Sequence, residues 1–91
     1  SAALFTEICR RADVPVQQFA NRSDLAGGST LGGISNTKVP LNTVDIGLAQ
    51  LAMHSSYETA GCADAAYLIR AAQEFYRSTL ETSEDGTYTL L

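Results

Sequence analysis

The stretch TVDIGLAQLAMHSSYETAG, residues 43–61, is the most informative about the fold of this 91-residue chain. Its first half alternates apolar residues with polar or small ones, and Val44, Ile46 and Leu48 form the apolar set. A period of two places alternate side chains on one face of an extended chain. Residues 43–48 are therefore predicted to form a half-buried or core strand.

The second half of this stretch contains His54, the only histidine in the sequence. Ser55 and Glu58 follow it with the three-residue spacing of a capping box, which predicts that a helix opens there. No second His or Cys lies nearby at metal-ligand spacing, which favours a structural histidine. The end of a strand is also where α/β folds place ligands, which favours a functional one. From the residues alone, both interpretations stay open.

Working outward, residues 2–12 predict a helix that ends at Asp13, because the residue before Pro15 is pushed out of the helical region. Residues 16–19 predict a short strand, and a short helix with Leu31 and Ile34 on its buried face follows a glycine-rich turn. A long amphipathic helix is expected from about residue 64 to about residue 80. The tail, 81–91, has an Asp-Gly turn signal and a β-like run at 87–91. It is either flexible or an added edge strand.

This order, α-β-α-β-α, predicts an α/β fold in which the two strands are parallel. Parallel sheets are normally covered on both faces and rarely consist of two strands. Both strands would also be edges with unpaired backbone groups. The pattern therefore indicates one end of a larger α/β domain.

The glycine-rich segment AGGST, residues 26–30, has two interpretations. It is either a tight turn between a strand and a helix, or a cradle of backbone N–H groups for an anion at Gly27–Thr30. It matches neither nucleotide-binding glycine pattern, so a nucleotide site is weakly supported. Asp24, just before it, reads on its own as a turn or capping carboxylate.

Composition excludes several classes of function. Ten acidic and six basic residues give a net charge of −4, which argues against a nucleic-acid partner. No apolar run is long enough to span a membrane, and no signal peptide is recognisable. Cys9 and Cys62 lack metal or disulfide spacing and are expected to be reduced and partly buried. A cytoplasmic location is expected.

The two motifs NRSDLAGGSTLGGIS, residues 21–35, and TVDIGLAQLAMHSSYETAG, residues 43–61, closely resemble the C-terminal part of aspartyl aminopeptidase-like zinc metallopeptidases. This family includes vacuolar aminopeptidase I and bacterial members. The resemblance implies that residues 1–91 are a C-terminal segment of a three-layer αβα zinc-peptidase (phosphorylase/hydrolase-like) catalytic domain. It also implies removal of N-terminal residues from peptides, two zinc ions in each active site, and a homo-oligomer.

The resemblance assigns roles residue by residue. His54 matches the zinc-ligating histidine of the family's QLAMHS motif, and Gly28, Ser29 and Thr30 would line the substrate cleft. Asp24 and Ser55 would either contact and orient the metal ligands or have a structural role in turns. No catalytic residue is expected within these 91 residues, since the other ligands and the general base lie elsewhere in the family.

The chain alone is therefore expected to be inactive and to bind zinc weakly or not at all, because catalytic zinc sites take about three protein ligands. Its partners would be peptide substrates and the rest of its own catalytic domain, without nucleic acid or membrane. Two alternatives from other classes are a small anion-binding α/β module using Gly27–Thr30 and a non-catalytic interaction domain.

Overall fold

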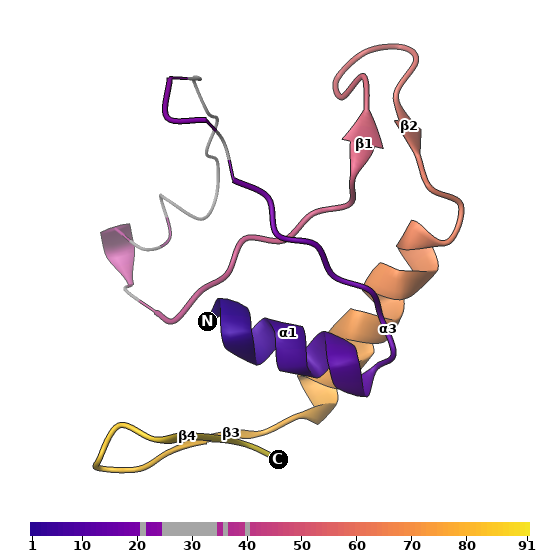
Figure 1. Ribbon diagram of the computed structural model, residues 1–91. Helices are drawn as coiled ribbons and strands as arrows, with labels where there is room; N and C mark the ends of the chain where they lie inside the picture. The colour runs from indigo at the N-terminus through magenta and orange to yellow at the C-terminus, as the bar shows by residue number, and fades with distance from the viewer. Residues whose placement is uncertain (21, 25–34, 36, 40) are drawn as a thin grey trace.

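The computed structural model of the chain describes residues 1–20, 22–24, 35, 37–39 and 41–91. Its elements run α1 (Ala2–Arg11), β1 (Gln50–Leu51), β2 (Thr59–Ala60), α3 (Asp64–Arg77), β3 (Leu80–Thr82) and β4 (Tyr88–Leu90). The helices α1 and α3 and two antiparallel hairpins are the main elements of the described structure, which also includes helical residues at 35, 37 and 38 (Figure 1). No helix within it is long and apolar enough to cross a membrane.

Helix α1 packs across α3, and this contact forms the small core of the described residues (Figure 1). The predicted apolar stripe of α1 faces the contact, with Ile8 and Cys9 buried, and α3 contributes Ala71. Burial raises the pKa of the Cys9 thiol because the thiolate would lose its hydration. Cys9 and Cys62 are both free thiols, as predicted, but Cys62 is exposed.

The end of α1 has a specific backbone structure. Asp13 adopts a left-handed conformation with φ of 56°, and its N–H donates to the Arg10 carbonyl at 3.2 Å. The Val14 N–H donates to the Cys9 carbonyl at 2.8 Å, so the pair of bonds forms a Schellman motif. The carbonyl of Asp13 accepts from the Arg70 guanidinium of α3 at 2.9 Å. The predicted helix end is confirmed, and it is tied to the second helix.

The predicted strands at 16–19 and 43–48 do not form in the described structure. Both segments are irregular, and the ladders that do form, β1–β2 and β3–β4, are antiparallel rather than parallel. A strand needs a neighbour whose backbone takes up its N–H and C=O groups, and neither segment belongs to a β-ladder of the described structure. The predicted short helix with Leu31 and Ile34 includes residues outside the described part of the chain.

The predicted helix opening at Ser55 is also wrong. Gln50 pairs with Ala60 and Leu51 with Thr59, so residues 52–58 form the loop of a hairpin. The polar side chains expected to cap a helix bond to the backbone of this loop instead. The long helix begins at Asp64, after Gly61, where the sequence predicted a fresh start.

The C-terminal residues form the second hairpin. Leu80, Glu81 and Thr82 pair with Leu90, Thr89 and Tyr88 in that order. The expected Asp-Gly turn forms at its tip, where Gly86 has a φ of 84°, which a residue without a side chain adopts readily. The Arg11 guanidinium donates to the Leu90 carbonyl at 2.9 Å, which joins this hairpin to α1.

Candidate functional site

His54 lies in the loop of the β1–β2 hairpin, three residues after the end of β1 at Leu51. It is exposed, and its backbone is left-handed with a φ of 69°. Ala52 in the same loop has a φ of 52°. Non-glycine residues rarely adopt this region, and such conformations persist only where neighbouring contacts hold them. The loop that presents the imidazole is therefore constrained at two positions.

Hydrogen bonds from side chains hold this loop. Ser55 Oγ donates to the Ala52 carbonyl at 2.6 Å and accepts from the Tyr57 N–H at 3.1 Å. The Ser55 N–H also donates to the Ala52 carbonyl, at 3.1 Å. The Glu58 carboxylate accepts from the His54 N–H at 3.0 Å. Ser55 thus fixes the turn before Tyr57, and Glu58 contacts the backbone of the histidine itself.

The role of Glu58 in this loop was not predicted from the sequence, which assigned it to a helix cap. Its spacing from Ser55 suits a capping box, and the same side chain can reach a backbone N–H four residues earlier when the chain turns back. The sequence feature that could have indicated this role is the polar segment 52–58, which is flanked by the short strands 50–51 and 59–60. Short strands of two residues are difficult to recognise from periodicity.

Of the other predicted site residues, Ser55 lies in the His54 loop, and Asp24 has Arg22 as its side-chain partner rather than His54. Asp24 forms a bidentate ion pair with Arg22, with nitrogen–oxygen distances of 3.1 and 2.6 Å, and this contact lowers the pKa of the Asp24 carboxyl. Both side chains are exposed. Gly28, Ser29 and Thr30 lie outside the described residues, as does the predicted anion cradle at Gly27–Thr30.

The groups around His54 suit zinc only in part. A neutral imidazole is a usual zinc ligand, and the His54 side chain is exposed without a hydrogen bond to other described residues. Among the residues with described positions, however, no group of three His, Cys, Asp or Glu side chains could hold a metal ion. The described residues therefore do not form a complete zinc site.

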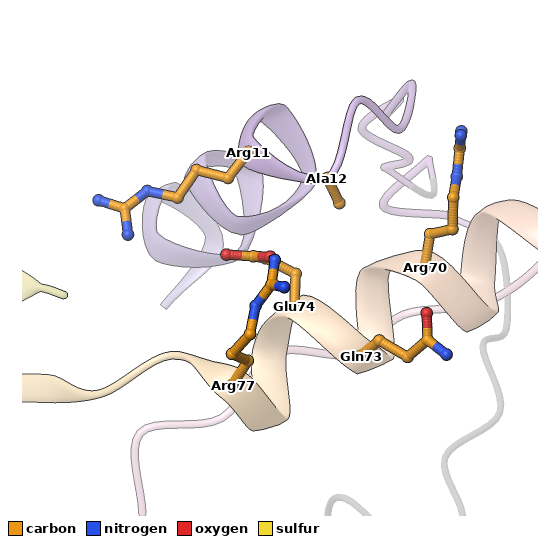
Figure 2. Close-up of a pocket in the computed structure, with 6 residues that line it drawn as sticks. All are labelled: Arg11, Ala12, Arg70, Gln73, Glu74 and Arg77. Atoms are coloured by element: carbon orange, nitrogen blue, oxygen red, sulfur yellow. The ribbon is translucent and has the colours of Figure 1, made fainter.

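A shallow hollow of about 380 Å³ lies between α1 and α3 and is unrelated to the His54 loop. Three of its lining residues are arginines, but Figure 2 shows the Arg11 and Arg70 side chains pointing in different directions. Arg11 bonds to the C-terminal hairpin, Arg70 bonds to the end of α1, and Arg77 pairs with Glu74. The Arg11 and Arg70 guanidiniums thus join different elements, the Arg77 guanidinium pairs within α3, and the three do not converge on a ligand.

Comparison with known proteins places this geometry in context. A family model described as aminopeptidase I zinc metalloprotease (M18) matches residues 1–76. The chain is 50% identical over 76 residues to a probable M18 family aminopeptidase 2 from Clostridium novyi. It is 46% identical over 79 residues to a protein of the same name from Pseudomonas aeruginosa. These matches cover 84% and 87% of this chain but only 18% of each relative. No solved structure matches significantly.

Proposed function

This chain belongs to the M18 family of aminopeptidase I zinc metalloproteases, and we propose that it supplies His54 as one zinc ligand of a dinuclear aminopeptidase site. The observation that carries the proposal is the family match over residues 1–76, which includes the whole His54 loop. Bound zinc would polarise the scissile carbonyl of a peptide and acidify a water molecule. The role of this chain is to present the imidazole.

The remaining ligands and the general base would come from other parts of a three-layer αβα catalytic domain. Support for this comes from the absence of a three-ligand cluster among the described residues and from the 18% of each relative that the chain spans. The 91 residues alone are expected to be inactive and to bind zinc weakly. Peptides would be the substrates, and the complete enzyme is proposed to be a cytoplasmic homo-oligomer.

The exposed apolar surface supports the rest of this catalytic domain as the partner. Only Ile8, Cys9 and Ala71 are buried apolar residues in the described structure. Large apolar side chains of the amphipathic helix α3 are largely uncovered, with Ile69 57% and Phe75 52% exposed. A folded domain normally buries such residues, since each large side chain contributes about 1.5–3 kcal/mol on burial. In this proposal, residues 16–19 and 43–48 become strands next to that domain.

The test is the His54→Ala substitution in the full-length protein that carries this segment. Zinc per protomer, measured by plasma mass spectrometry after dialysis, should fall, and hydrolysis of an aminoacyl-p-nitroanilide should be lost. Ser56→Ala is the matched control, because this exposed residue lies in the same loop. Wild-type zinc content and activity in His54→Ala would refute the proposal.

A further inference from the structure

We propose that Glu58 is a positioning residue for His54, a role that rests on the proposed function of His54 as a zinc ligand. The Glu58 carboxylate accepts the His54 N–H at 3.0 Å. By holding this N–H, it would keep the His54 backbone left-handed and thereby set the direction in which the imidazole leaves the loop.

The backbone conformation requires such a contact. His54 and Ala52 both have positive φ, which is unfavourable for residues with a β-carbon. Ser55 holds the Ala52 carbonyl through its N–H and its hydroxyl, but no Ser55 bond reaches His54. Among the described hydrogen bonds, the Glu58 carboxylate is the acceptor for the His54 N–H. The histidine conformation therefore depends on this carboxylate.

The chemistry and position of Glu58 suit this role. An ionised carboxylate accepts a stronger hydrogen bond from a backbone N–H than a neutral group does. Glu58 directly precedes β2, where Thr59 is paired with Leu51, so its backbone is anchored to the hairpin. Glu58 takes part in none of the ion pairs found among the described residues. Among the described residues, no Lys or Arg side chain forms an ion pair with its carboxylate.

Groups behind a metal ligand commonly orient it, and their removal lowers metal affinity by about 10–100-fold. Most such groups bond to the second nitrogen of the imidazole. Glu58 would instead act on the backbone of His54, whose conformation sets where the imidazole points. Replacing Glu58 should therefore disturb the His54 loop even without metal, and should weaken zinc binding when the complete site is present.

The first readout is independent of zinc and activity. In the ¹⁵N-labelled 91-residue chain, Glu58→Ala should speed amide exchange at His54 by about 5- to 10-fold, the equivalent of one lost hydrogen bond. The coupling constant between the amide and α protons of His54 should also change as φ leaves 69°. Glu58→Gln keeps an acceptor oxygen and should retain most of the protection. Glu84→Ala removes an exposed carboxylate in the other hairpin and serves as the control.

The second readout uses the full-length protein. Zinc affinity, measured by competition with a chromogenic chelator, should fall about 10–100-fold in Glu58→Ala and recover substantially in Glu58→Gln. Unchanged His54 exchange and unchanged zinc affinity in Glu58→Ala would overturn the positioning role. So would exchange that rises equally at Ala71, because the effect would then be general unfolding. Unchanged zinc affinity in His54→Ala would instead overturn the proposed function.

Discussion

The contact between α1 and α3 predicts a large difference between two identical substitutions. Ile8 is 5% exposed in this contact, whereas Ile69 on α3 is 57% exposed. Shortening Ile8 to alanine removes three buried carbon groups, each contributing about 0.8 kcal/mol. The cavity left behind raises the expected loss in the free energy of unfolding to about 3 kcal/mol. Ile69→Ala should lose about 1 kcal/mol or less, because over half of that side chain is already in water.

Both substitutions gain the same small benefit from the higher helix propensity of alanine, so this term cancels in the comparison. The remaining difference of about 2 kcal/mol should separate the urea midpoints of the two variants by about 1–2 M. Urea unfolding followed by far-ultraviolet circular dichroism of the 91-residue chain measures it. Midpoints for Ile8→Ala and Ile69→Ala that agree within error would refute the assignment of the core to this contact.

Three further predictions concern local structure. Hydrogen bonds from the Arg10 guanidinium help lower the pKa of Glu7 from 4.5 to about 2. The stability that Glu7 adds over Glu7→Gln should therefore be complete above about pH 4.5 and disappear as the pH falls towards 2, as urea midpoints at pH 7, 4 and 2 would reveal. A β-carbon at Gly61 would lie 2.7 Å from Asp64 Oδ2, so Gly61→Ala and Asp64→Ala should be coupled by about 0.5–1 kcal/mol in a double-mutant cycle, and strict additivity would contradict the contact. Because Asp13 is left-handed, Asp13→Gly should raise the thermal midpoint modestly while Asp13→Val lowers it, and the reverse order would exclude the Schellman end of α1.

The helices were predictable because their information is local. The predicted helix at 2–12 is observed at Ala2–Arg11, and the expected start near residue 64 is observed at Asp64. A helix bonds to itself within four residues, so apolar spacing and a following proline suffice to find it. The Asp-Gly turn at Gly86 was likewise predictable from the sequence, since glycine readily adopts a positive φ such as the 84° observed there.

The strands were not predictable to the same degree, because a strand is defined by its neighbour. Val44, Ile46 and Leu48 alternate as a strand should, yet residues 43–48 belong to neither of the β-ladders of the described structure. The hairpin at 50–60 forms instead, since its two halves meet through a short loop. Ser55 and Glu58 could serve either a helix cap or a loop, and the pairing of Leu51 with Thr59 selected the loop.

The amino-acid order alone thus specified two amphipathic helices, the end of the first, the family motifs and His54 as the candidate zinc ligand. Those features depend on residues close together along the chain. The left-handed backbone of His54 and its bond to Glu58 span only a few residues, but they belong to a loop that the pairing of β1 with β2 closes. The packing of α1 on α3 joins segments that meet only when the chain folds. Only the tertiary structure decided these features, since periodicity records a residue's own face and not what will lie against it.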